Sequence, residues 1–197
     1  MKRDEKTLWN RKYRERSHMA LEPDPFLVSA YTELLEGSAP GTALDVAGGV
    51  GRHALWLADR GWQVKLVDIS ENGIELARKN SPSTVELEVL DLQKVRDLGR
   101  AKYDLVIVFF YLQRSLFPAL MKALKPGGLL IYKTYTLEQQ RFSGGPSHPV
   151  HLLKPNELLR AFASLRILRY HETVRERGIA ELAARKILGR RKGELRC

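Results

Sequence analysis

The sequence predicts an α/β fold: a Rossmann-like, doubly wound sheet that is mostly parallel, with an antiparallel edge strand and helices on both faces. Short apolar runs alternate with helical patterns from residue 42 to residue 135, and this alternation is the order that builds a parallel sheet. A glycine-rich turn follows the first apolar run, at the carboxyl end where such sheets bind ligands. Two late strand-like runs have no full crossover helix between them, which predicts an antiparallel pair at one edge.

The first half of the chain is expected to alternate helices and strands. An amphipathic helix follows the break at 23–26 and stops near Gly37. The helix after the glycine turn ends at Gly61, and Ser70 is a suitable N-cap for the next helix. The apolar face of the helix after the glycine turn consists of Ala54, Leu55, Leu57 and Ala58. The remaining elements are strands at 42–46, 63–69, 84–90 and 103–110, with helices at 51–61 and 70–80.

The second half begins with a helix at 114–124 that carries Pro118 in its first turn. We expect this helix to stop at the KPGG turn of 125–128, before a fifth strand at 129–135. The polar segment 136–152 is long for a connection in a compact domain and is typical of functional lids or disordered loops.

The end of the chain predicts one more helix and two strands. The helix at 154–163 begins near Pro155, and 165–174 is a sixth strand. Residues 178–187 have the propensity of a helix but the position of the last strand in an antiparallel hairpin, and we favour the strand.

The net charge of +10 is concentrated at the two ends of the chain. Residues 1–16 carry +4 and residues 185–197 carry +5, so the body is nearly neutral. Basic ends can contact nucleic-acid phosphates, but we favour solvated ends that aid solubility.

The chain shows no sign of membrane insertion or of a disulfide framework. No apolar run approaches the ~20 residues that span a bilayer, and the charged N-terminus lacks the apolar core of a signal peptide. Cys197 is the single cysteine. We therefore expect a soluble, cytoplasmic protein without membrane partners.

The glycine turn itself admits two interpretations. Gly49, Gly51 and Ala54 match the dinucleotide fingerprint, with Asp68 near the distance expected for an acid that binds a ribose. Asp45 argues against a dinucleotide, because a carboxylate beside the turn would repel a pyrophosphate. A nicotinamide-dependent reductase is therefore a weaker alternative.

A cofactor with a positive charge and no phosphate removes this conflict. S-adenosylmethionine carries a sulfonium and an amino group at one end, and a ribose and an adenine at the other. Asp45 suits the positive end, and glycines let that end approach the backbone. Asp68, after the second strand, can accept both ribose hydroxyls, and Asp91, after the third, can accept from the adenine amino group.

The stretch from 42 to 135 resembles the class I S-adenosylmethionine-dependent methyltransferases. The matching pieces are LDVAGGVGR, VKLVDIS, VLDLQ, YDLVIVFFYL and LKPGGLLIYKTY, in this order. Ala47 departs from the glycine that is usual at its position in the family. The opening LWNRKYRER and the segment GRHALWLADRGW look like the branch with the tellurite-resistance and thiopurine-type enzymes.

The resemblance implies a role for each matching position. The methionine part of the cofactor would be lined by Asp45, Ala47, Gly49 and Gly51. The nucleoside would be bound by Asp68 at the ribose, Ile69 on the adenine face, and Asp91 and Leu92 at the adenine edge. Phe109, after the fourth strand, would lie by the reactive methyl. The product would be S-adenosylhomocysteine.

The acceptor is less sharply indicated than the cofactor. Proximity and in-line geometry can supply ~7–11 kcal/mol in such a transfer, so we assign no catalytic residue and no metal. After the fourth strand stands FFYLQRS instead of the Asn/Asp-Pro-Pro-aromatic motif that grips a planar amino group. With Cys197 as the one thiol, cysteine-dependent methylation of pyrimidine carbon is also disfavoured.

Several side chains are candidates for the acceptor side. Trp9 and Tyr13 are spaced to share one helical face, and a terminal helix with this pair could close over the cofactor or simply dock on the core. The other candidates are Tyr111, Gln113, Arg114, Arg141, His148 and His151, with a solvated loop favoured as the explanation of the two histidines.

We expect one methyltransferase domain over 1–197. Its parts would be an N-terminal helical cap at 1–40, a cofactor-binding core at 41–135, a substrate-side loop at 136–152, and a C-terminal helix with antiparallel strands at 153–197. The favoured function is methyl transfer to a small molecule with a sulfur, oxygen or chalcogen acceptor. The alternative is an RNA-directed methyltransferase or an RNA-binding protein that uses the basic termini.

Overall fold

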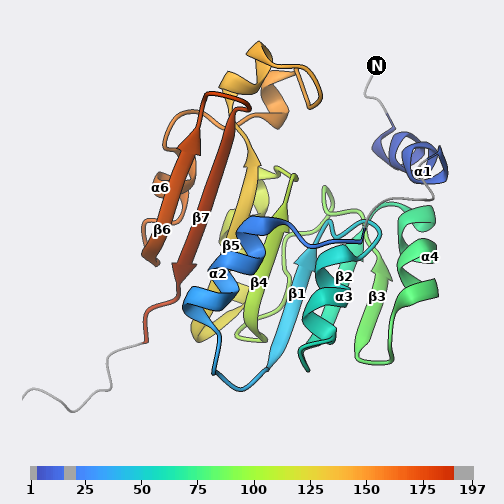
Figure 1. Cartoon of the computed structure of the whole chain (residues 1–197), viewed down its shortest axis with the longest axis vertical. Helices are drawn as coiled ribbons and strands as arrows, with labels where there is room; N and C mark the ends of the chain where they lie inside the picture. The colour runs from blue at the N-terminus through green and yellow to red at the C-terminus, as the bar shows by residue number, and fades with distance from the viewer. Residues whose placement is uncertain (1–3, 16–20, 189–197) are drawn as a thin grey trace, which may run out of the picture.

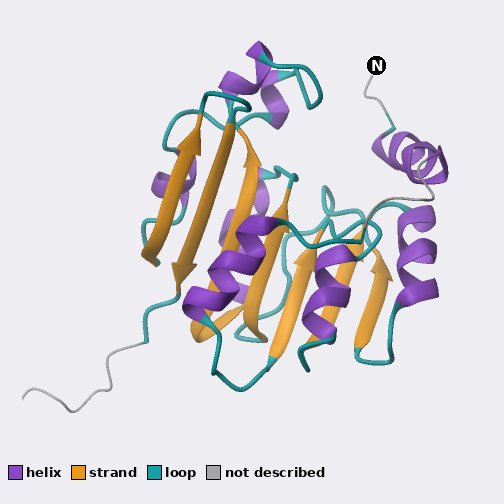
Figure 2. Ribbon diagram, in the orientation of Figure 1, coloured by secondary structure: helices purple, strands orange, loops and turns teal. Residues whose placement is uncertain are grey.

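The computed structural model describes residues 4–15 and 21–188, which form a seven-stranded sheet flanked by helices (Figures 1 and 2). The strand order is β3-β2-β1-β4-β5-β7-β6. The strands β1 to β5 pair in parallel, and β7 runs antiparallel to β5 and β6. The predicted Rossmann-like sheet with an antiparallel edge is confirmed.

The strands are β1 (Thr42–Val46), β2 (Gln63–Asp68), β3 (Val85–Val89), β4 (Tyr103–Phe109), β5 (Leu124–Tyr135), β6 (Arg166–Thr173) and β7 (Ile179–Arg185). The helices are α1 (Glu5–Glu15), α2 (Pro25–Leu34), α3 (Arg52–Ala58), α4 (Glu71–Asn80), α5 (Phe117–Ala123) and α6 (Glu157–Ala161), with 3₁₀ turns at Arg114–Leu116, Leu137–Arg141 and Pro149–His151.

The core lies in two layers, one on each face of the sheet. Alternate residues of a strand point to opposite faces, so Leu105 and Ile107 of β4 join one layer while Val106 and Val108 join the other. Helices α2, α3 and α4 cover the first layer, and α5 and α6 cover the second. Asp45 points to the α2–α3–α4 side, because its neighbour Leu44 belongs to the opposite layer.

The choice of a strand for the end of the chain is correct. Strand β7 pairs with β5 on one side and with β6 on the other, through seven registered residues on each side. Its alanines are good helix formers, yet Ala180, Ala183 and Ala184 are fully buried within the sheet. Hydrogen bonding to two neighbouring strands therefore outweighs local helix propensity here.

The fifth strand begins earlier than predicted, at Leu124 instead of 129. Its extra residues are those of the expected KPGG turn. Gly127 donates a backbone hydrogen bond to the carbonyl of Lys186, and Lys186 donates to the carbonyl of Gly128. Gly127 adopts a φ of +82°, which permits an irregularity in β5. There the pairing register of β5 with β4 shifts between Tyr103 and Leu105.

Two helices differ in extent from the prediction. The helix expected at 154–163 spans only Glu157–Ala161, because the Glu157 carboxylate accepts from the backbone N–H of Lys154 and closes a turn. The helix expected at 114–124 opens with a 3₁₀ turn before α5, and Pro118 lies in the first turn of α5 as predicted.

The segment 136–152 is anchored to the fold at both ends. The Gln139 side chain is buried and accepts a hydrogen bond from the backbone N–H of Gly178. Leu137 donates to the carbonyl of Leu153, which in turn donates to the carbonyl of Tyr135. This segment lies above the same edge of the sheet as α1, on the opposite side of the molecule (Figure 1).

A buried ionic cluster joins α2 to the centre of the sheet. The Lys133 ammonium lies 2.8 Å from Asp24, the N-cap of α2, and 2.9 Å from Glu181 of β7. Replacing Lys133 by Met would leave the buried Asp24 and the half-buried Glu181 without a counter-charge, and we expect a loss of about 3 kcal/mol in the free energy of unfolding. Urea unfolding at pH 7 measures this loss.

The matched control for Lys133→Met is Lys65→Met. Lys65 also bridges two carboxylates, Glu86 and Glu88, each at 2.7 Å, but these are 68% and 40% exposed. The exposed cluster should contribute at most about 1 kcal/mol. Equal losses in the two variants would contradict the importance of burial at Lys133.

Candidate functional site

The glycine turn leaves β1 in a left-handed conformation. Ala47, Gly49 and Gly51 have φ values of +56°, +57° and +83°, and Gly48 donates to the carbonyl of Val67. An alanine in this region carries a strain of about 1–2 kcal/mol, so Ala47 is held there by its surroundings. A side chain at Gly48 would collide with the Asp45 carboxylate, whose Oδ2 lies 2.7 Å from the position of such a Cβ. The turn is therefore packed closely onto Asp45.

A cavity of about 240 Å³ lies at the carboxyl ends of β1, β2 and β4, and residues of α1 form part of its wall. Figure 1 shows α1 crossing this edge of the sheet beside the start of α4. The cavity is lined by Glu5, Trp9, Tyr13, Ala47, Gly48, Gly49, Val50, Arg52, His53, Asp68, Ile69, Asp91, Leu92, Gln93, Phe109, Phe110 and Tyr111.

Asp68, at the end of β2, ties the glycine turn to α4. Its Oδ2 accepts from the backbone N–H of Gly49 at 2.9 Å, and its Oδ1 accepts from Ser70 at 2.8 Å. Burial raises the pKa of this carboxyl, while the N–H donors act in the opposite direction. Each carboxylate oxygen retains a further lone pair, so Asp68 can still accept hydroxyl groups in the cavity.

Asp45 is buried and only weakly compensated. It is 1% exposed, and neither of its oxygens has a partner in good hydrogen-bond geometry among the described residues. Burial, together with the nearby Asp68, raises the pKa of this carboxyl to about 7, although Arg52 and the backbone N–H of Ala54 oppose the shift. Such a group gains from a cation brought close to it.

His53, in the first turn of α3, is a cavity residue that the sequence analysis did not select. Its ring is 4.2 Å from that of Phe109 between centroids, and its Nε2 has no partner among the described residues. Burial, with Arg52 and Lys133 nearby, lowers the pKa of His53 to about 3. The imidazole is therefore neutral at pH 7.

The apolar face predicted for the helix after the glycine turn was wrong in part. Leu55 and Ala58 are only half-buried, whereas His53 is buried together with Ala54 and Leu57.

The helix α1 brings an aromatic pair to the cavity. The rings of Trp9 and Tyr13 stack at 5.7 Å between centroids, and the Tyr13 hydroxyl lies against Gly49. Burial, followed by the charges of Asp68 and Asp45, raises the pKa of the Tyr13 phenol, which stays protonated at neutral pH. This position is compatible with both alternatives for the pair, closure over the cofactor and docking on the core, and both stay predictions.

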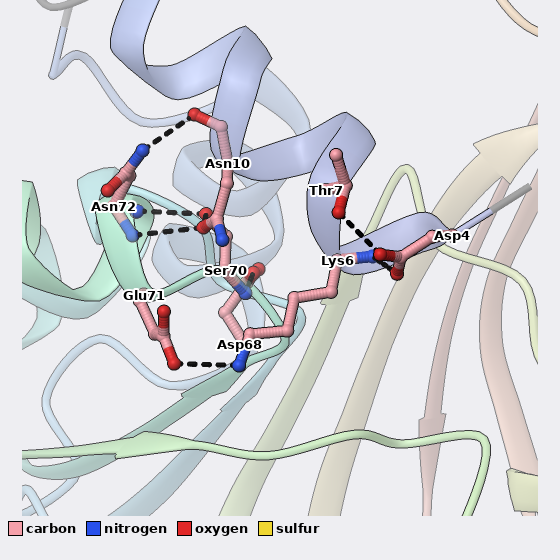
Figure 3. A network of polar contacts seen from close by, with 9 residues as sticks. Asp4, Lys6, Thr7, Asn10, Asp68, Ser70, Glu71 and Asn72 are labelled. Atoms are coloured by element: carbon pink, nitrogen blue, oxygen red, sulfur yellow. Dashed lines mark hydrogen bonds and ion pairs between the residues drawn. The ribbon is translucent and has the colours of Figure 1, made fainter.

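Polar contacts hold α1 on the N-terminus of α4 (Figure 3). The Asn10 side-chain carbonyl accepts from the Ser70 hydroxyl at 2.7 Å and from the backbone N–H of Asn72 at 3.2 Å. Asn72 donates in turn to the Asn10 backbone carbonyl, and Lys6 pairs with Glu71 at 2.7 Å. Ser70 also caps α4 by accepting from the N–H of Gly73, as predicted. One cluster of polar contacts therefore joins α1, the N-cap of α4 and, through Ser70, the Asp68 carboxylate.

The cofactor-side residues divide into cavity wall and support. Asp45 lies behind the turn, and Gly51 packs toward Ala77 and Leu66 as the N-cap of α3; neither lines the cavity. The predicted residues in the wall are Ala47, Gly49, Asp68, Ile69, Asp91, Leu92 and Phe109.

The acceptor-side candidates are mostly remote from the cavity. Tyr111 lines it, but Arg114 does not: its guanidinium pairs with Glu157 at 2.6 and 2.9 Å and donates to the carbonyls of Val150 and Leu152. Arg114 thus holds the segment 136–152 against α6, and an anion-binding role has no support here. The side chains of Arg141, His148 and His151 are exposed, and His148 caps a 3₁₀ turn through Val150. The Gln113 amide is bonded to Ser115.

The cavity residues that the sequence analysis missed come from positions beside the motifs. Arg52 and His53 directly follow the glycine turn, and Phe110 directly follows Phe109 with a φ of +57°. The period of α3 places one face inward, so the spacing from Ala54 and Leu57 could have selected His53. The complete set of missed residues is Glu5, Gly48, Val50, Arg52, His53, Gln93 and Phe110.

Comparisons with known proteins match this chain to methyltransferases. Residues 43–128 match the family model described as "Methyltransferase domain". The chain is 38% identical over 82 residues to a tRNA (uracil(54)-C(5))-methyltransferase of Pyrococcus horikoshii, covering 42% of this chain and 19% of that protein. It is 28% identical over 139 residues to a ubiquinone biosynthesis O-methyltransferase of Idiomarina loihiensis, covering 59% and 57%. The chain thus spans from about a fifth to just over half of the length of these relatives.

Among solved structures, an S-adenosylmethionine-dependent methyltransferase from Mesorhizobium loti has the same fold. The TM-score is 0.70 at 18% identity, over 85% of this chain and all of the other. Residues 43–128 form the matched methyltransferase domain, and its fold is that of the class I S-adenosylmethionine-dependent methyltransferases. The likeness to the tellurite-resistance and thiopurine-type branch stays a prediction.

The cavity is chemically suited to the cofactor of this superfamily. The carboxylate of Asp45, buried and without a partner among the described residues, fits a cationic amino group, and Asp68 keeps lone pairs for hydroxyl groups. In residues 4–15 and 21–188, no group of three or more His, Cys, Asp or Glu is arranged to hold a metal ion. No helix within these ranges has the length and apolar character needed to cross a membrane.

The raised pKa of Asp45 predicts a pH dependence that Asp45→Asn removes. In the unfolded chain this carboxyl titrates near 3.8, whereas in the folded protein it titrates near 7. The folded state therefore binds the extra proton, and the contribution of Asp45 to wild-type stability falls as the pH rises from about 4 to 7. We expect the free energy of unfolding of Asp45→Asn to gain on the wild type across this range, by roughly 2–4 kcal/mol in total.

Urea unfolding at pH 4.5, 6 and 7.5 measures this gain. Stability changes from His53 have the opposite sign, since its folded pKa is lowered, but they are common to both proteins and cancel in the difference. Asp59→Asn, at an exposed position after α3, is the control and should run parallel to the wild type. A parallel curve for Asp45→Asn would show that Asp45 titrates normally.

Proposed function

We propose that the protein transfers a methyl group from S-adenosylmethionine to a small-molecule acceptor with a sulfur, oxygen or chalcogen nucleophile. The observation that carries this proposal is the pairing of two buried carboxylates with a glycine turn. Asp68 is matched by backbone donors, and Asp45 has no partner in the described part of the chain. A phosphate-bearing cofactor would oppose both charges, whereas a cationic nucleoside is attracted by them.

The proposal assigns roles to Asp45 behind the turn and to residues of the cavity wall. Asp45 acts through the turn on the cofactor's amino group, while Ala47 and Gly49 let its methionine part lie against the backbone. Asp68 accepts from the ribose hydroxyls, and Asp91 accepts from the adenine amino group. The adenine lies between the apolar side chains of Ile69 and Leu92, which both line the cavity.

When bound, the cofactor supplies an electrophilic methyl group on its sulfonium. The chain's contribution is to hold the acceptor in line and to exclude water. Phe109 and Tyr111 flank the proposed methyl end of the cavity, and Trp9 and Tyr13 close it from α1. His53 is neutral at pH 7, so it can take part in a hydrogen bond without adding charge beside the sulfonium.

The chain divides naturally around this reaction. We propose that residues 1–40 cap the site, that 41–135 bind the cofactor, and that 136–152 approach the acceptor. The part from 153 onward completes the sheet through β6 and β7, which support β5. On this division, acceptor choice belongs to the two segments that flank the strand ends in Figure 1.

Calorimetric titration of the purified chain tests the cofactor. We expect S-adenosylmethionine and S-adenosylhomocysteine to bind at micromolar concentration and NADH not to bind. Asp91→Asn, which leaves the glycine turn untouched, should weaken binding about tenfold, as expected for one hydrogen bond to a charged group. Asp59→Asn should bind like the wild type. Binding of NADH instead of the two nucleosides would overturn the proposal.

A second candidate acceptor is RNA, and one observation favours it. The relative with 38% identity is named for a tRNA, although the match covers 19% of that protein. The basic charge of this chain lies at its ends, and residues 189–197 are outside the described part. Cys197, the one thiol, is also outside it.

Salt dependence separates the two acceptors. A protein that uses six or more phosphate contacts loses about 10³-fold or more in affinity between 50 and 200 mM salt. For a small-molecule enzyme we expect only weak binding of unfractionated tRNA by fluorescence anisotropy, unaffected by S-adenosylhomocysteine. Tight, salt-dependent binding that the cofactor product strengthens would favour RNA as the acceptor.

A further inference from the structure

The cavity is electrically divided. Its acids, Glu5, Asp68 and Asp91, come from α1 and from the ends of β2 and β3. Arg52 is the one cationic side chain among the described residues of the wall. Its guanidinium faces the ring of Phe110, which follows β4 and so lies on the other side of β1 from the ends of β2 and β3. A ligand with one cationic or hydroxylated end and one anionic end would fit this arrangement.

Arg52 has no ion pair or side-chain hydrogen bond among the described residues. Its guanidinium Cζ lies 5.9 Å from the centre of the Phe110 ring, within cation–π range. It is the first residue of α3, where a cation is mildly disfavoured by the helix dipole. A half-buried arginine in this position retains donors for a planar oxyanion.

The other cation near Phe110 is already neutralised. Lys133 lies 5.8 Å from the same ring, but its ammonium pairs with Asp24 and Glu181. Arg52 therefore supplies the uncompensated positive charge at this end. Arg52 also acts electrostatically on Asp45, because it lowers the pKa of that carboxyl, but the two side chains form no ion pair or hydrogen bond.

The backbone at Phe110 is strained, and this strain fixes the position of its ring beside Arg52. Phe110 has a φ of +57°, and its N–H donates to the carbonyl of Lys133 at 2.7 Å. Its ring packs 5.2 Å from that of Tyr135, between centroids. A bulky residue held in the left-handed region is uncommon outside sites where its placement matters. Here the strain presents an aromatic surface beside the Arg52 guanidinium.

We infer that Arg52 binds a carboxylate or a related oxyanion at the β1–β4 end of the cavity, with Phe110 as the aromatic surface beside it. This inference rests on the proposed function. The oxyanion has two sources: the amino-acid carboxylate of the cofactor, or an anionic substituent of the acceptor. In the second case the acceptor is a planar, acidic molecule.

The first arm of the test compares S-adenosylhomocysteine with 5′-methylthioadenosine, which lacks the amino acid. Calorimetry is run on the wild type, Arg52→Gln and the control Arg60→Gln. Arg60 belongs to the turn that ends α3 and stacks on Trp56 at 3.7 Å, so it is another arginine on an aromatic ring, but it does not line the cavity. If the cofactor supplies the oxyanion, Arg52→Gln weakens S-adenosylhomocysteine at least tenfold and leaves methylthioadenosine unchanged.

The second arm uses acceptor probes in the presence of saturating S-adenosylhomocysteine. The probes are 4-hydroxybenzoate and its neutral amide, 4-hydroxybenzamide. If the acceptor supplies the oxyanion, the wild type and Arg60→Gln bind the benzoate more tightly than the amide. Arg52→Gln then binds the two probes equally, while its affinity for S-adenosylhomocysteine is unchanged.

The inference is wrong if Arg52→Gln matches the wild type in both arms. A change confined to the pH dependence of stability would show that Arg52 only balances Asp45, which also overturns it. Failure of the wild type to bind S-adenosylhomocysteine would instead remove the proposed function, and this inference with it. Equal binding by the wild type and Arg52→Gln leaves the proposed function intact, so the two failures are distinguishable.

Discussion

Two buried carboxylates packed against a glycine turn are the constraint on which the rest of the site depends. Asp68 is held by the N–H groups of Gly49 and Ser70, whereas Asp45 has no partner in the described structure. Burying an uncompensated carboxylate is costly, and the cost appears as a pKa near 7 at Asp45. The turn has to pack tightly to shield it, which explains why Gly48 has no room for a side chain. A cationic ligand would offset this cost, so folding and binding are coupled at one residue.

The polar contacts next to Asp68 also determine where helix α1 lies. Asn10 contacts Ser70 and Asn72 at the start of α4, two residues after the carboxylate that orders the turn (Figure 3). Within the described part of α1 no residue is fully buried, so polar contacts rather than a large apolar face hold it. Elements with few buried apolar contacts open at low free energy. The position of α1 therefore depends mainly on its polar contacts with the start of α4.

Charge compensation also sorts the arginines and lysines of the site into support and binding. Lys133 and Arg114 are saturated by carboxylates and carbonyls, so they hold α2, the sheet and the segment 136–152 together. Arg52 has no such partner in the described chain and lies in the cavity wall. The type of residue does not distinguish these roles. The distinction comes from which acids the fold brings within reach.

The sequence by itself determined the sheet, the glycine turn and the acids at the strand ends, because alternating apolar periods and turn residues are local signals. It also identified β7, though its alanines favour a helix. Tertiary structure alone decided the partners. It placed His53 against Phe109, buried Asp45 without a donor, and turned Arg114 toward Glu157. The two pairs join residues about 40 to 60 positions apart, and the state of Asp45 depends on its desolvation. No short stretch of the chain encodes a distant contact or the loss of solvent. Local pattern therefore predicts where a ligand lies, and packing decides which side chains meet it.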